Sequence, residues 1–183
     1  MIYIVVGAVI ILVVIVVLII HAYKADNMMI EFTKKINTSY EQINSEMHRR
    51  ADKVNELLKN IMPYIMYSKD LEQTTAKIKK SLDTYFSAGT RDYQVNAHLE
   101  ITKNLDELIN LIDTKYPDTF DDKIKSLIEE IKESDEKITF SKNIYNSLVQ
   151  NYNAYISKFL NKSIAKMFKY KKMEKLGEQN EKA

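Results

Sequence analysis

The stretch Ile2–Ile20, IYIVVGAVIILVVIVVLII, decides the fold because it holds nineteen consecutive residues without a charged or strongly polar side chain. At about 1.5 Å of rise per residue it forms a helix of roughly 28 Å, close to the roughly 30 Å hydrocarbon core of a bilayer. No basic residue precedes the stretch, and His21–Ala22–Tyr23 is a poor cleavage site for a signal peptide. The sequence therefore predicts an uncleaved transmembrane anchor, residues 1–22.

Basic residues near the span predict its orientation. Lys24, Lys34 and Lys35 follow it, whereas only the α-amino group precedes it. Such an excess of positive charge normally stays on the cytoplasmic side. We therefore expect a single-pass protein of the cell membrane with its N-terminus outside and residues 21–183 in the cytoplasm. The absence of cysteine fits this reducing compartment.

The composition after the span favours an all-α fold. Residues 23–160 are long enough for one domain with its own core. The whole chain has only three glycines and two prolines, too few for the turns of a sheet protein. Apolar residues recur every three or four positions, as in helices with one buried face. The residues expected to face inward include Ile36, Ile43, Val54, Ile61, Leu71, Ile78, Leu82, Leu99, Leu105, Leu108, Ile124, Ile131, Ile138, Ile156 and Phe159.

Two arrangements of helices fit this pattern. Ser68 interrupts the first apolar stripe, and Asp70 with Gln73 has the spacing of a capping box, which predicts a new helix from Asp70. The chain would then form an up-down four-helix bundle with coiled-coil-like packing, which returns Phe159 to the membrane. If Pro63 only kinks a longer helix, the domain has three long helices and its C-terminus lies far from the membrane. We favour four helices because the Ser68 signal is the more specific one.

Charged residues interrupt the apolar stripes at two places. Arg49 and Arg50 break the first helical pattern, and Asp135 and Glu136 break the last one. In the four-helix arrangement the two places differ in height by roughly 9 Å, which long side chains can span. We expect Arg49 or Arg50 to pair with Asp135 or Glu136 as a structural polar pair. The alternative is that all of them extend into solvent.

Two Tyr-Asn dipeptides, Tyr145–Asn146 and Tyr152–Asn153, lie seven residues apart in the last predicted helix. Seven residues are about two helical turns, so both tyrosines fall on the core stripe and both asparagines beside it. Tyr and Asn could together bind a ligand or partner, but buried tyrosines with satisfied hydroxyl groups account for the pattern as well. We favour the structural interpretation, and the sequence leaves a partner open.

These motifs resemble the LemA family of membrane-anchored bacterial proteins. The similarity rests on the N-terminal span, on the paired Tyr-Asn dipeptides and on three further runs, Arg49–Arg50–Ala51–Asp52, Tyr116–Pro117–Asp118 and Asp135–Glu136–Lys137–Ile138. The chain departs from the family pattern at Lys53, Asn55, Glu56, Lys142 and Leu160. The resemblance implies a short external N-terminus and a cytoplasmic helical bundle. It implies no reaction.

Catalytic and metal-binding motifs are absent from the sequence. The three histidines, His21, His48 and His98, lack the Glu-x-x-His spacing of a di-iron bundle. The sequence also contains no His-Glu-x-x-His motif, no phosphate-binding glycine loop and no Gly-x-Ser-x-Gly motif. We therefore predict no enzymatic activity, no catalytic residues, no metal site and no cofactor.

Charge is segregated in the last third of the chain. Residues 100–136 hold twelve acids and five lysines, net −7, whereas residues 137–175 hold nine lysines and one acid, net +8. Basic residues interleaved with apolar and aromatic ones are typical of contacts with an anionic membrane surface or nucleic acid. We expect residues 161–183 to form a basic tail. The candidate contact residues are Lys158, Lys162, Lys166, Lys169, Lys171, Lys172 and Lys175.

The sequence as a whole predicts a membrane-tethered helical interaction or scaffolding protein. The membrane is favoured over nucleic acid as the partner of the basic tail, because the anchor already holds the domain beside lipid. The alternative function is a tethered nucleic-acid-binding protein. The sequence leaves open the identity of a protein partner and whether the chain self-associates.

Overall fold

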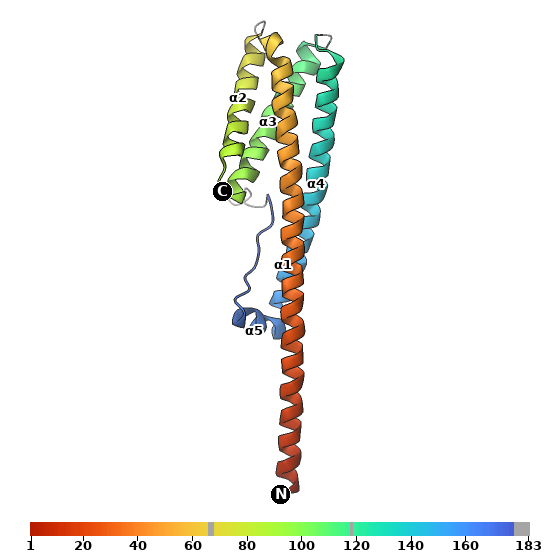
Figure 1. Ribbon diagram of the computed structural model, residues 1–183, viewed down its shortest axis with the longest axis vertical. Helices are drawn as coiled ribbons and strands as arrows, with labels where there is room; N and C mark the ends of the chain where they lie inside the picture. Colours follow the sequence, from red (N-terminus) through yellow and green to blue (C-terminus); the bar gives the residue numbers. More distant parts are fainter. Residues whose placement is uncertain (66–67, 118, 178–183) are drawn as a thin grey trace. The chain divides into compact units, whose positions relative to one another are not determined.

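Five α-helices make up the described part of the chain, and it contains no strand, which confirms the all-α prediction. The structure is a computed structural model that describes residues 1–65, 68–117 and 119–177 (Figure 1). Asp118 of the predicted turn and residues 178–183 of the predicted tail lie outside these ranges. The helices are α1 (Ile2–Ile65), α2 (Lys69–Ser87), α3 (Arg91–Lys115), α4 (Asp122–Ser157) and α5 (Phe159–Met167).

The chain divides into two compact units. Unit 1 contains Met1–Tyr40 and the described part of Asn143–Glu178, and unit 2 contains Glu41–Lys142. Unit 1 thus holds the apolar part of α1, the end of α4, α5 and the segment after α5. Unit 2 holds the second part of α1, α2, α3 and the first part of α4.

The start of α1 meets the requirements of a membrane span. It is the one helix among the described residues that is long and apolar enough to cross a membrane, and its first twenty residues are almost all exposed. Tyr3 and Tyr23 are exposed near the two ends of the apolar stretch. Tyr23 follows Tyr3 by twenty residues, which corresponds to about 30 Å along a helix, the approximate thickness of a bilayer's hydrocarbon core. Burial begins after the span, with Ala25 and Met29.

The chain turns between α1 and α2, so the arrangement with one kinked helix through this region is wrong. Pro63 lies inside the last turn of α1, and Ser68 caps α2 by accepting a hydrogen bond from the Leu71 backbone N–H at 3.3 Å. The cap is therefore Ser68 and not Asp70. The Tyr116 hydroxyl group also donates to the Ser68 hydroxyl oxygen at 2.7 Å, which links the end of α3 to the start of α2.

Unit 2 is built around a mainly apolar core, with α2 and α3 side by side (Figure 1). The prediction that Leu99 faces inward is wrong, because this residue is 41% exposed. Its neighbour His98 is buried instead and lies beside Arg50 of α1. The apolar side chains buried in this unit include Val54, Leu57, Ile61, Leu71, Ile78, Leu82, Tyr85, Ile101, Leu105, Leu108, Ile124 and Ile131.

The last apolar stripe is not one continuous helix. Lys158 has an extended backbone, with ψ of 144°, and separates α4 from α5. The break rotates α5 relative to the α4 stripe, so the prediction that Phe159 faces inward is wrong: its side chain is 89% exposed. Asn161, which is buried, fixes the break by donating from Nδ2 to the Tyr155 carbonyl oxygen at 3.1 Å.

Candidate functional site

The two Tyr-Asn dipeptides hold the extended segment that follows α5. In unit 1, the Asn153 side chain donates to the Met173 carbonyl oxygen at 2.8 Å and accepts from the Met173 N–H at 2.9 Å. Asn146 makes the same pair of bonds with Leu176, at 3.2 and 2.9 Å. Each amide side chain therefore satisfies both main-chain groups of one residue. We call Tyr145, Asn146, Tyr152 and Asn153 together the Tyr-Asn clamp.

The two tyrosines of the clamp bind the same segment. The Tyr152 hydroxyl group donates to the Lys171 carbonyl oxygen at 3.0 Å, and the Tyr145 hydroxyl group donates to the Glu174 carbonyl oxygen at 3.5 Å. Both rings are buried, and the Tyr152 ring lies 6.3 Å from that of Phe32 on α1. Burial raises the pKa of Tyr152, so its hydroxyl group stays protonated and remains a donor.

The seven-residue spacing of the clamp has a geometric reason. Each dipeptide binds the carbonyl group of one residue and both main-chain groups of the residue two further on, and the two contact sets are three residues apart. Seven residues of α-helix rise by about 10.5 Å, and three residues of extended chain span about 10 Å. The helix and the segment run in opposite directions, since Tyr152 binds before Tyr145 along the segment. The distance between the two dipeptides along α4 thus matches the distance between their two sets of partners along the extended segment.

The sequence predicts that Tyr145 and Tyr152 lie on the core stripe of the helix, and both are buried. It does not predict that Asn146 and Asn153 bind the segment after α5. Their partners are main-chain groups twenty to thirty residues further along the chain. A main-chain partner leaves no side-chain pattern in the sequence. The repeated Asn at the edge of an apolar stripe was the available signal, because the side-chain amide of Asn can accept from an N–H and donate to a carbonyl group at once.

A tight turn connects α5 to the clamped segment. The Tyr170 N–H donates to the Ala165 carbonyl oxygen at 2.8 Å and the Lys169 N–H to the Lys166 carbonyl oxygen at 3.3 Å, which is the pattern of a Schellman motif. Lys169 occupies the left-handed position, with φ of 62°. The Tyr170 hydroxyl group donates to Asp26 of α1 at 2.8 Å. Burial and the adjacent carboxylate raise the pKa of Tyr170 to about 12.

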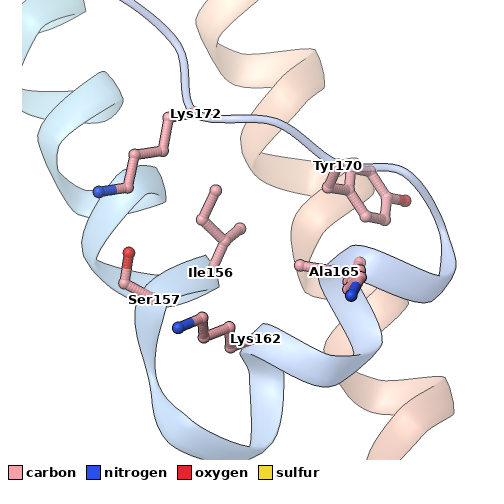
Figure 2. A pocket seen from close by; sticks show the side chains of 7 residues that line it. Ile156, Ser157, Lys162, Ala165, Tyr170 and Lys172 are labelled. Carbon is pink, nitrogen blue, oxygen red and sulfur yellow. The ribbon is translucent and has the colours of Figure 1, made fainter.

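A pocket of about 520 Å³ lies between the end of α4, α5 and the clamped segment (Figure 2). Figure 2 shows the amino groups of Lys162 and Lys172 on the side of the pocket where the Ser157 hydroxyl group lies, with Tyr170 at the other end. The clamp fixes the main chain on both sides of Lys172. The pocket is lined by Ile156, Ser157, Lys162, Ala165, Lys166, Tyr170 and Lys172.

Three of the seven predicted basic residues line this pocket, and six of the seven are exposed. Lys162, Lys166 and Lys172 are exposed, as are Lys169 and Lys171. Lys158 lies 5.7 Å from the centre of the Tyr155 ring, and Lys175 is half-buried. Large apolar side chains are exposed beside them, namely those of Phe159, Leu160, Met167 and Phe168.

A second polar cluster lies inside unit 2, centred on Arg50. The Arg50 side chain is 2% exposed, and its guanidinium group lies 3.2 Å from a carboxylate oxygen of Asp135. It also donates to Thr102 Oγ1 at 3.0 Å and lies 3.3 Å from His98 Nε2. Arg49 pairs with Glu46 at 2.6 Å instead, and Glu136 is exposed.

His98 is held neutral by this cluster. Burial, followed by the positive charges of Arg50 and Lys142, lowers the pKa of His98 to about 3. Since arginine can only donate, Nε2 of His98 acts as the acceptor, and the ring proton lies on Nδ1. Burial also lowers the pKa of Arg50, while Asp135 and Asp106 oppose that shift. Within the described ranges, no group of three His, Asp or Glu residues could hold a metal ion.

The fold and the clamp define a class of helical protein with a candidate membrane anchor and a C-terminal segment fixed against its last long helix. Residues 39–183 match the profile of the LemA family, which is most of the chain. The chain therefore belongs to the LemA family. The comparison with curated proteins finds no match.

Proposed function

We propose that this protein is a membrane-tethered interaction and scaffolding module. Its helical part faces the cytoplasm, and it carries out no chemistry of its own. The apolar start of α1 anchors the chain, and the basic region around α5 contacts the anionic surface of the same membrane. The remaining helical surface is available to a protein partner. The observation that carries the proposal is the hydrogen bond between Tyr170 and Asp26.

This bond holds the basic region close to the end of the span. Asp26 is six residues after Ile20, the last residue of the apolar stretch, which corresponds to about 9 Å along the helix. The attraction between a lysine and anionic lipid extends over about one Debye length, roughly 8 Å at physiological salt, and contributes about 1 kcal/mol for each lysine near the surface. Lysines next to Tyr170 therefore lie within reach of the lipid headgroups.

The apolar side chains of α5 support the same contact. Phe159, Leu160, Met167 and Phe168 are exposed in the unit that contains the span. An apolar and basic surface of this kind suits the boundary between headgroups and acyl chains. No such observation favours nucleic acid as the partner.

A tryptophan reporter tests the membrane contact, because the chain contains no tryptophan of its own. Phe159→Trp in the full chain, in nanodiscs that contain brominated lipid, should show strong fluorescence quenching with anionic lipid and weaker quenching with neutral lipid. Phe140→Trp is the matched control, since Phe140 is also exposed but belongs to unit 2. Equal quenching at the two positions, or no dependence of the Phe159→Trp signal on lipid charge, would contradict the proposed contact.

A further inference from the structure

The pocket beside α5 has the composition of an anion site. Three of its lining residues are lysines, and none is an acid. Among the described residues, no carboxylate oxygen forms an ion pair with Lys162, Lys166 or Lys172. The three lysines come from α5 and the clamped segment, so the turn at Lys169 and the clamp bring them together. Like charges that converge without a counter-ion favour the binding of an anion.

We propose that this pocket binds a phosphate group, supplied by an anionic phospholipid of the membrane that anchors α1. The inference rests on the proposed function and names the ligand of its basic region. A tetrahedral phosphate can accept hydrogen bonds from several sides at once. The amino groups of Lys162 and Lys172 and the Ser157 hydroxyl group lie on one side of the pocket and supply such donors (Figure 2).

The size and lining of the pocket fit a headgroup attached to an apolar chain. A volume of about 520 Å³ exceeds that of a phosphate group alone and falls within the range of small-molecule sites. Ile156 and Ala165 add an apolar wall, against which the glycerol carbons of a lipid can lie. Tyr170 joins the pocket to Asp26, just after the span, which places the site at headgroup level. A lipid is therefore favoured over free phosphate.

The Tyr-Asn clamp positions one of the three lysines. Tyr152 binds the carbonyl group of Lys171 and Asn153 binds both main-chain groups of Met173, so the residue between them has a fixed place at the pocket. Tyr152 and Asn153 act as positioning residues, because they reach the ligand only through Lys172. The clamp motif of the last long helix and the basic region thus belong to one site.

Lysine acylation in nanodiscs tests this assignment in the full chain. Mass spectrometry gives the labelling rate of each lysine with phosphatidylglycerol and with phosphatidylcholine. Because each lysine in such a contact contributes about 1 kcal/mol, phosphatidylglycerol should slow the labelling of Lys162 and Lys172 by about fivefold or more. The exposed Lys171, which does not line the pocket, should be slowed much less.

Variants with matched charge complete the test. Lys172→Gln should restore fast labelling of Lys162 in phosphatidylglycerol, whereas Lys171→Gln, with the same loss of charge, should not. Asn153→Ala, which changes no charge, should also weaken the protection of Lys162. If the segment acts only through its total charge, Lys171→Gln and Lys172→Gln should change the labelling rate of Lys162 equally. That result would contradict the proposed phosphate site.

The outcomes separate this inference from the proposed function. Uniform slowing of all exposed lysines, together with quenching of the Phe159→Trp reporter, would reject the pocket and leave the membrane contact intact. Protection of Lys162 and Lys172 by inorganic phosphate in phosphatidylcholine nanodiscs, without protection by phosphatidylglycerol, would reject the lipid as the source. Absence of both protection and quenching would reject the site and the proposed contact.

Discussion

In unit 2 the buried Arg50 binds other side chains, whereas in unit 1 the Tyr-Asn clamp binds the main chain of a distant segment. The contacts of the Arg50 guanidinium group in the described part of unit 2 are with the side chains of Asp135, Thr102 and His98. The clamp uses main-chain groups of the segment, and Lys171 and Lys172 of that segment are exposed. The comparison shows that polar side chains can fix the path of a distant segment through its main-chain groups alone.

The largest effect is expected for the ion pair of unit 2. Asp135→Ala should lower the free energy of unfolding by about 3 kcal/mol, because it removes the carboxylate that pairs with the buried Arg50 guanidinium group. The matched control is Glu129→Ala, which removes the partner of Lys132 in an exposed pair and should cost about 1 kcal/mol or less. Chemical denaturation measures both. Negligible coupling between Arg50→Ala and Asp135→Ala in a double-mutant cycle would refute the structural role of the pair.

A pH dependence of stability should come from His98 in the same cluster. Its pKa is about 3 in the folded protein and near 6.5 when unfolded, so the unfolded chain binds more protons between these values. The free energy of unfolding should therefore fall as the pH drops from about 6.5 towards 3, by up to about 1.4 kcal/mol per pH unit. Denaturation curves at several pH values measure this slope.

His98→Gln should remove this contribution, since an amide oxygen can accept from Arg50 without titrating. If His98→Gln and the unchanged protein lose stability equally over this pH range, His98 is not the titrating group.

The clamp of unit 1 should show a smaller and more local effect. Asn153→Ala removes two hydrogen bonds to Met173 and should weaken the docking of the segment by about 1 to 3 kcal/mol. Trypsin should then cleave after Lys171 and Lys172 at least about fivefold faster. Asn151→Ala, an exposed asparagine of the same helix, is the matched control. Unchanged cleavage in Asn153→Ala would show that the clamp does not hold the segment.

The smallest effect is expected at the turn between α5 and the clamped segment. Lys169→Gly should raise the free energy of unfolding by about 1 kcal/mol, because glycine adopts the left-handed conformation without steric cost. Lys166→Gly removes the same charge from inside α5 and should lower it by about 0.5 to 1 kcal/mol. Thermal unfolding compares the two. A change of the same sign in both variants would contradict the role of Lys169 in this turn.

The helical fold follows from local patterns in the sequence, whereas the site depends on contacts between distant residues. The apolar period gives the all-α class, and Ser68 gives the turn between α1 and α2. No glycine or proline marks the helix break at Lys158 in the sequence, so the exposure of Phe159 was not predicted. Arg50 and Asp135 were identifiable as interruptions of apolar stripes, but His98 has no such signal.

The clamp shows the same limit for the functional site. The spacing of Tyr145 and Tyr152 predicts their burial, while the partners of the two asparagines are main-chain atoms that any sequence would provide. The excess of lysine in residues 137–175 was enough to predict a basic region. Which of these lysines line the pocket depends on the turn at Lys169 and on the clamp, and neither was predicted from the sequence.

Amide hydrogen exchange of the full chain in nanodiscs tests the central claim most directly, which is that asparagine side chains hold the C-terminal segment by its main chain. The N–H groups of Met173 and Leu176 donate to Asn153 and Asn146, so both should exchange slowly in the unchanged protein. Asn153→Ala should speed exchange at Met173 more than at Leu176, and Asn146→Ala should do the reverse. Exchange of both amides at the rate of an unstructured chain in the unchanged protein would contradict the account.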